Sequence, residues 1–181
     1  MRTIIEQIHD VQLKTFCSLE VFRSKDYLSI LPNKRRGLYW LWSNLTLEEL
    51  ELNTLPHSRM EVPISRLISH RKELNGICKL ENSNYVVVYN GIGGYKKIPA
   101  SFGLRERIYQ EAKANGNTVG TLNILQNSDI SRWAVSYFDF DAPENKKIIQ
   151  QLNSTSPYLE YAKDLEMLWR LHYGSPILTR H

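Results

Sequence analysis

The stretch with the clearest capacity for chemistry lies mid-chain, where glycines follow an apolar run. Residues 85–90 are rich in Val and Tyr and predict a buried central strand. Gly91, Gly93 and Gly94 come next. Glycine adopts positive φ and lets backbone amides approach an anion closely. The sequence therefore predicts a strand that ends in a phosphate-handling turn.

The helix expected after this turn carries a cation and a phenol one turn apart. Leu104, Ile108 and Ala112 recur every four residues and predict its buried stripe. Arg105 and Tyr109 share another face, which we expect to be exposed. A guanidinium beside a phenol suits a phosphoryl group. An ordinary strand–loop–helix unit with a solvated arginine explains the same pattern.

A carboxylate on the last predicted helix is the second candidate. That helix is expected from about Pro157 to Tyr173, and Glu166 lies at the edge of its apolar stripe, beside Leu165 and Trp169. A glutamate in this position costs desolvation free energy unless a cation compensates it. Mg²⁺ takes carboxylate oxygen and keeps several waters. Glu166 is therefore a candidate metal ligand, and a structural salt bridge is the alternative.

The rest of the chain supplies the elements that must position these groups. Strands are expected at 37–42, 85–90 and either 121–126 or 132–140, and helices at 1–16, 43–52, 64–75 and 157–173. These elements predict a single domain over 1–181, of α/β (α+β) class, with a small antiparallel three-stranded sheet flanked by helices. Residues 1–34 would form an N-terminal helical extension.

Composition restricts the classes of function. The chain has 181 residues, of which 23% are charged, and it has no apolar run long enough to span a membrane. This composition is typical of a soluble domain, and we expect a cytoplasmic one. Cys17 and Cys78 lie far apart, which predicts reduced thiols rather than a zinc site. The formal net charge of +4 favours an anionic partner.

Two basic clusters have the composition of a nucleic-acid-binding surface. One is the turn with Arg35 and Arg36, and the other is the helix face with Arg66, Arg71 and Lys72. Such clusters contact backbone phosphates in nucleic-acid-binding proteins. A solvated protein face has the same composition, and it is the alternative.

The order of these motifs resembles that of the GIY-YIG nuclease family. The matching residues are Gly37-Leu-Tyr39, Tyr89-Asn-Gly91, Arg105-x-x-x-Tyr109 and Glu166. The resemblance covers 35–178 and places a helical insertion, 43–84, between the first two motif strands. Leu38 and Asn90 replace the usual isoleucines, and Thr179 stands near where many members carry an asparagine.

The resemblance implies a divalent-metal-dependent endonuclease that hydrolyses phosphodiester bonds in double-stranded DNA, such as a type II restriction enzyme, with a homodimer as an option. Glu166 would bind Mg²⁺, for which Mn²⁺ could substitute. Arg105 would donate to a phosphoryl oxygen. The water would be positioned or deprotonated by one of three phenols, with a lysine after the glycine turn assisting. The phenols are those of Tyr39, Tyr89 and Tyr109, and the lysine is Lys97 or the DNA-contacting Lys96.

Two other classes of function fit the same residues. One is a non-catalytic nucleic-acid-binding module that retains the nuclease fold. The other is a hydrolase or transferase that acts on small phosphorylated molecules. Metal-dependent nicking of plasmid DNA distinguishes the endonuclease from both.

Overall fold

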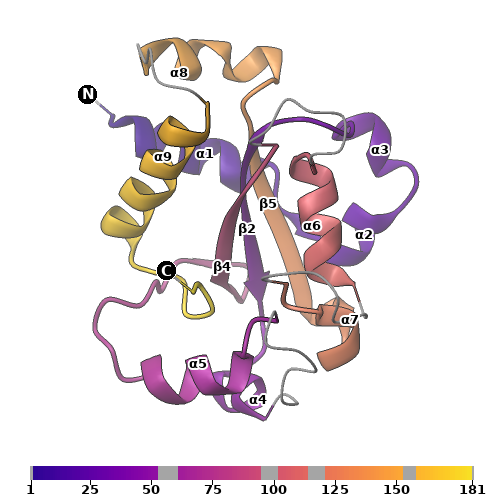
Figure 1. Ribbon diagram of the computed structural model, residues 1–181, viewed down its shortest axis with the longest axis vertical. Helices are drawn as coiled ribbons and strands as arrows, with labels where there is room; N and C mark the ends of the chain where they lie inside the picture. The colour runs from indigo at the N-terminus through magenta and orange to yellow at the C-terminus, as the bar shows by residue number, and fades with distance from the viewer. Residues whose placement is uncertain (1, 53–60, 95–101, 114–120, 153–157, 181) are drawn as a thin grey trace.

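The computed structural model describes residues 2–52, 61–94, 102–113, 121–152 and 158–180. Its centre is a five-stranded sheet in the order β1-β5-β2-β4-β3, in which every neighbouring pair is antiparallel (Figure 1). The strands are β1 (Cys17–Ser18), β2 (Gly37–Ser43), β3 (Glu81–Asn82), β4 (Tyr85–Gly93) and β5 (Trp133–Asp139). The prediction of a three-stranded sheet is wrong, because two-residue strands extend it at both edges. Strands that short show no alternating pattern in a sequence.

Helices cover both faces of the sheet (Figure 1). They are α1 (Ile4–Lys14), α2 (Leu19–Arg23), α3 (Tyr27–Ile30), α4 (Leu47–Glu51), α5 (Ile64–Arg71), α6 (Leu104–Ala112), α7 (Ile124–Asn127), α8 (Lys146–Gln151) and α9 (Tyr158–Tyr173), with short 3-10 turns at Ile130–Arg132 and Pro143–Asn145. The predicted helices at 1–16, 43–52, 64–75 and 157–173 are found as α1, α4, α5 and α9, each within narrower bounds. Within the described residues, no helix has both the length and the apolar character that a membrane span needs.

The third long strand is β5, which lies within the predicted range 132–140. The other predicted range, 121–126, is not a strand. Thr121 to Ile124 are fully or almost fully buried, but Asn123 has a left-handed φ of 47° and α7 begins at Ile124. The alternation of polar and apolar residues in this segment therefore does not reflect a strand, and both kinds of residue are buried in irregular backbone.

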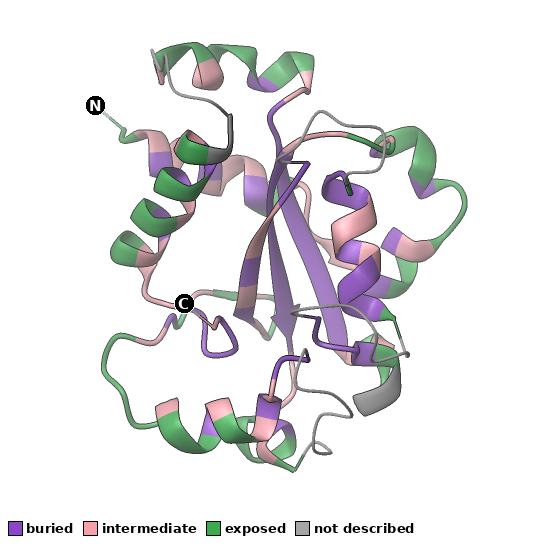
Figure 2. Ribbon diagram, viewed as in Figure 1, coloured by how far each residue is buried: buried purple, intermediate pink, exposed green. Residues whose placement is uncertain are grey.

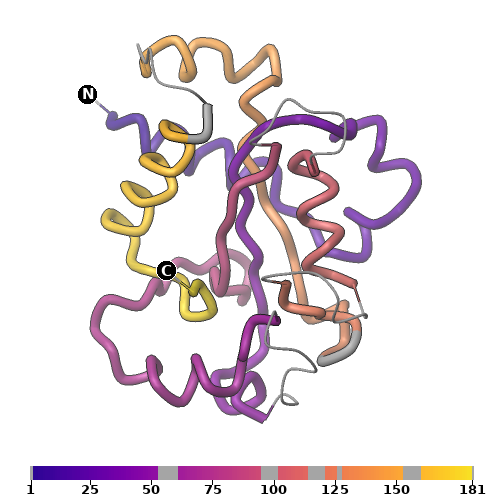
Figure 3. Tube along the Cα trace, viewed as in Figure 1, coloured from indigo at the N-terminus to yellow at the C-terminus, as the bar shows by residue number. Residues whose placement is uncertain are grey.

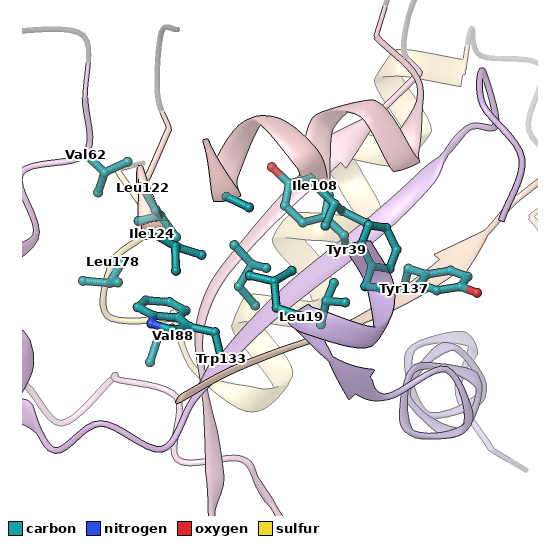
Figure 4. Packing of buried hydrophobic residues seen from close by; sticks show 14 of the residues in the cluster. Leu19, Tyr39, Val62, Val88, Ile108, Leu122, Ile124, Trp133, Tyr137 and Leu178 are labelled. Atoms are coloured by element: carbon teal, nitrogen blue, oxygen red, sulfur yellow. The ribbon is translucent and has the colours of Figure 1, made fainter. Parts of the chain in front are cut away.

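Strand β2 is the centre of the molecule and is buried along its whole length, as is β5 (Figure 2). It pairs with β4 on one side and β5 on the other. Leu38, Trp40 and Trp42 pack in a core cluster with residues of α1 and α9. Tyr39 and Leu41 pack in a second cluster with residues of α2 and α6 (Figure 4). The strand thus separates two cores, one on each face.

The glycines after residue 90 extend β4 instead of opening a turn. Gly91 and Gly93 belong to the strand, and only Gly94 has a positive φ, 74°. A Cβ on Gly93 would lie 2.4 Å from the Leu104 Cα atom. Glycine at this position therefore allows the start of α6 to contact the backbone of β4 directly.

The segment after α9 folds back against the chain that precedes β4 (Figure 3). The Ser175 amide donates to the Gly76 carbonyl at 2.9 Å, and the Cys78 amide donates to the Ser175 carbonyl at 2.9 Å. Further along, the Leu178 amide donates to the Val88 carbonyl, also at 2.9 Å. These bonds fix the last described residues beside β4.

Candidate active site

A cleft of about 990 Å³ lies beside the second half of β4, with lining residues from β2, β4, α6, α9 and the C-terminal segment. Strand β3 pairs only with the first two residues of β4, which leaves this part of the sheet edge uncovered by any described strand. Four of the lining side chains are cationic and two are anionic: Arg107, Lys163, Arg170 and Arg180 against Asp164 and Glu166. The lining therefore has a surplus of positive charge.

Two tyrosines meet at the bottom of this cleft. The register pairs Tyr39 with Gly91 and Leu41 with Tyr89. As a result the rings of Tyr39 and Tyr89 lie 6.2 Å apart, centroid to centroid. A Cβ on Gly91 would lie 2.5 Å from the Tyr39 hydroxyl oxygen, so glycine leaves the space that this ring occupies. The pairing of β2 with β4 thus brings together the motifs Gly37-Leu-Tyr39 and Tyr89-Asn-Gly91.

A buried carboxylate, which the sequence analysis missed, lies behind Tyr39. The Tyr39 hydroxyl donates to Glu111 Oε1 at 2.7 Å, and the Leu122 amide donates to Glu111 Oε2 at 3.0 Å. The Arg107 guanidinium lies 3.5 Å from the same carboxylate. Burial raises the pKa of Glu111 to about 7, although Arg107 and both hydrogen bonds oppose the shift.

The same surroundings also raise the pKa values of Tyr39 and Tyr89. Burial and the negative charge of Glu111 raise the pKa of Tyr39 well above its ordinary value. Burial and Glu111 likewise raise the pKa of Tyr89. Neither phenol is therefore ionised at neutral pH, and a phenolate is not the resting form of either group.

The arginine that reaches the cleft is Arg107, not Arg105. Arg105 is only 6% exposed, so the prediction that it lies on an exposed face is wrong. Its guanidinium stacks on the Tyr109 ring at 4.8 Å and donates to the Tyr109 hydroxyl at 3.0 Å. That hydroxyl donates in turn to the Arg23 carbonyl at 2.8 Å. Arg105 and Tyr109 thus join α6 to α2, away from the cleft.

The signal for Arg107 was present in the sequence. Arg107 and Glu111 have the same four-residue spacing as Arg105 and Tyr109. Six of the nine residues of α6 are buried, polar ones included. Because the polar sides of this helix are buried too, hydropathy did not indicate which arginine faces the cleft.

Glu166 lies on the cleft wall and is held there by a polar network. The Arg170 guanidinium donates to Glu166 Oε1 at 2.9 Å and to Asn90 Oδ1 at 3.0 Å. The Thr179 hydroxyl donates to the same Asn90 oxygen at 3.2 Å. Burial raises the pKa of Glu166, and Arg170 opposes this rise. Asn90 thus joins β4 to α9 and to the C-terminal segment.

The donor set of the cleft fits a weakly held hard cation. Among the described residues, no group of three or more His, Cys, Asp or Glu side chains converges on one point. Glu166 lines the cleft with one carboxylate, and Asp164 is exposed nearby. Mg²⁺ is commonly bound through one or two carboxylates and keeps several waters, so the residues present fit this ion.

The predicted DNA-contacting arginines before β2 are engaged elsewhere. Arg35 lines a separate pocket of about 370 Å³, and its Nη1 donates to the Asp141 carbonyl at 2.8 Å. The Arg36 Nε donates to Asp141 Oδ1 at 2.9 Å. Neither side chain lines the cleft.

The predicted basic face of α5 is partly engaged as well. Arg71 donates to the carbonyls of Ile177 and Thr179 and so supports the C-terminal segment. The Lys72 ammonium lies 2.7 Å from Glu51 Oε2, while Arg66 is exposed. Lys96 and Lys97 lie outside the described residues.

The cleft therefore combines two phenols, a wall carboxylate and a surplus of cations, and a buried carboxylate lies behind one of the phenols. No family model, curated protein or solved structure matches the chain. A functional assignment must therefore rest on the chemistry of the cleft.

Proposed function

We propose that the chain is a divalent-metal-dependent DNA endonuclease that resembles the GIY-YIG nucleases, with its active site in the cleft beside β4. One observation carries the proposal. Two tyrosines, an arginine and a glutamate, from β2, β4, α6 and α9, line a single cleft. An arginine can stabilise charge on a phosphoryl group and a glutamate can hold a divalent cation, and the positive lining complements a phosphate backbone.

Each side chain has a task that its surroundings support. Arg107 donates to a non-bridging phosphoryl oxygen, for which a planar guanidinium is well shaped. Tyr89, half-buried on the cleft side, orients the attacking water. Arg170 holds the Glu166 carboxylate in place through the 2.9 Å hydrogen bond. Glu166 is the residue that would hold Mg²⁺ or Mn²⁺, and the bound ion supplies charge neutralisation at the phosphoryl group.

The test is metal-dependent nicking of supercoiled plasmid by the wild type and by Glu166→Gln. Glutamine keeps the shape of the side chain but removes the charge that a cation needs, so we expect nicking to fall by about 10²-fold or more while duplex binding persists. Chelation with EDTA should abolish wild-type nicking. Sequencing of the fragment ends shows whether cleavage has the site specificity of a restriction enzyme.

Glu160→Gln is the matched control, since it removes an exposed carboxylate from the first turn of the same helix. It should nick at the wild-type rate. A folded Glu166→Gln variant that also nicks at the wild-type rate contradicts the proposal.

A non-catalytic nucleic-acid-binding module is the second candidate, and one observation favours it. Arg170 already pairs with the Glu166 carboxylate, as the structural alternative for Glu166 predicts. Salt-dependent duplex binding, with no nicking in Mg²⁺ or Mn²⁺, selects this candidate.

A further inference from the structure

Three exposed apolar side chains lie together on α9. Met167 is 53% exposed, Leu168 43% and Leu171 75%, and their spacing of three and four residues makes them neighbours on the helix surface. Single exposed apolar residues are common on soluble proteins, but a contiguous group of them marks a site of interaction. Because Met167 and Leu171 also line the cleft, this group bears on the ligand that the cleft takes.

Met167 lies at the centre of the helix surface that faces the cleft. Lys163 precedes it by four residues, Arg170 and Leu171 follow it by three and four, and all of them line the cleft. Glu166, the candidate metal ligand, is its neighbour in the chain and lines the cleft too. Charged groups therefore flank a flexible apolar side chain on one surface.

This combination of groups fits DNA whose base stack has been opened. The lining holds four cationic and two anionic side chains, which favours a polyanion over an apolar protein surface. In a regular duplex the apolar faces of the bases are stacked on one another and are not accessible. They become accessible when a base step opens, and proteins that kink DNA insert side chains such as Leu, Ile and Met at such a step.

We propose that Met167 and Leu171 insert into an opened base step of the DNA bound in the cleft. The preferred substrate is then duplex DNA with an unpaired or easily unstacked step. This inference rests on the proposed function, which identifies the ligand as DNA, and it deepens that function by naming the substrate class. The position of Met167 next to Glu166 places the opened step beside the phosphate that is cut.

The cost of opening a step determines which DNA binds best. Pyrimidine–purine steps such as TA are easily kinked, whereas A-tracts are stiff. On fully paired DNA we therefore expect binding and cutting to favour pyrimidine–purine steps. A bulge with one unpaired base removes most of the cost of unstacking before the protein binds.

The experiment compares affinities for two short duplexes, one fully paired and one with a single unpaired adenine at its centre. Both are measured in EDTA, so that no metal-dependent cleavage occurs. The wild type should bind the bulged duplex about tenfold or more tightly, because less unstacking is needed. Met167→Ser and Leu171→Ser should bind the two duplexes equally. Met167→Leu keeps an apolar side chain of similar size and should retain the preference.

Lys163→Gln and Leu74→Ser are the controls. Lys163 lines the same cleft, so its loss should weaken the binding of both duplexes by the same factor and leave their ratio unchanged. Leu74 is 55% exposed, follows α5 and does not line the cleft. Its serine variant should therefore match the wild type for both duplexes.

Equal affinity of the wild type for the two duplexes overturns the inference, and so does a preference that both serine variants keep. A dimeric wild type that Leu171→Ser converts to a monomer also overturns it, because a second copy of the chain would then cover the apolar group. In these cases the endonuclease function still stands or falls on plasmid nicking. A preference for the bulged duplex without any nicking supports the inference and selects the non-catalytic binding module. A wild type that binds neither duplex and nicks no plasmid overturns both.

Discussion

Two residues along one helix separate a structural arginine from one that reaches the cleft. Arg105 is enclosed by the rings of Tyr109 and Phe22, with its guanidinium 4.8 and 5.6 Å from their centroids. Arg107 lies beside Glu111 and lines the cleft. The two positions differ by about 200° around the helix axis, which explains why they have opposite environments.

This difference predicts opposite effects for two alanine substitutions. Arg107→Ala removes a donor to the phosphoryl group and should reduce turnover by roughly 10²–10³-fold. Arg105→Ala leaves a cavity in the contact between α2 and α6, so it should lower the melting temperature but keep turnover per folded molecule within about threefold of wild type. Nicking rates normalised to folded protein by circular dichroism measure both effects. Equal losses of turnover in the two variants would remove the distinction between these arginines.

Among the secondary-structure elements, the sequence predicts the long strands well and the irregular buried segments poorly. Runs of aromatic and β-branched residues identified β2 and β4, and their pairing follows from the antiparallel sheet. The segment 121–124 alternates polar and apolar residues as a strand would, but all four residues are buried in irregular backbone.

The sequence did not indicate Glu111 for a related reason. A glutamate on a helix is expected to be exposed to solvent. The buried partners of Glu111, Tyr39 and the Leu122 amide, are apparent only in the folded structure.

The contact between α9 and β4 depends on Asn90, which predicts a specific substitution effect. Asn90→Leu leaves the Arg170 Nε and the Thr179 hydroxyl without this acceptor in a buried region, and such a loss costs about 1–3 kcal/mol of unfolding free energy. Because Arg170 also positions Glu166, nicking should fall more than the population of folded protein does. Urea denaturation and nicking rates on the same samples measure the two losses.

A control for Asn90 is Asn82→Leu. Asn82 is half-buried in β3, away from the cleft. A nicking rate that falls only in proportion to folded Asn90→Leu protein would reduce Asn90 to a purely structural role.

Over the whole molecule, formal charge is a poor guide to where an anion binds. The basic clusters identified in the sequence include Arg36, paired with Asp141, and Lys72, paired with Glu51. The cleft lining also gathers four cationic and two anionic side chains, from segments that are far apart in the chain. Only the folded arrangement brings these charges together.

The salt dependence of duplex binding tests this placement with two exposed cations. Lys163 lines the cleft on α9, whereas Arg66 is on α5 and does not line it. Lys163→Gln should lower the slope of log affinity against log salt by roughly 0.9, the value for one lost phosphate contact. Arg66→Gln should leave the slope unchanged. The reverse result would place the DNA over α5, as the sequence alone suggested.

The segment after α9 folds back onto the sheet, and this has a consequence for when the candidate site is complete. The wall of the cleft requires Glu166, Arg170 and Thr179, which are synthesised long after Tyr39 and Tyr89. Ribosomes add roughly 5–20 residues per second, so a growing chain carries the tyrosines for seconds before their partners exist. The cleft therefore has no complete wall until the segment that follows α9 has been synthesised.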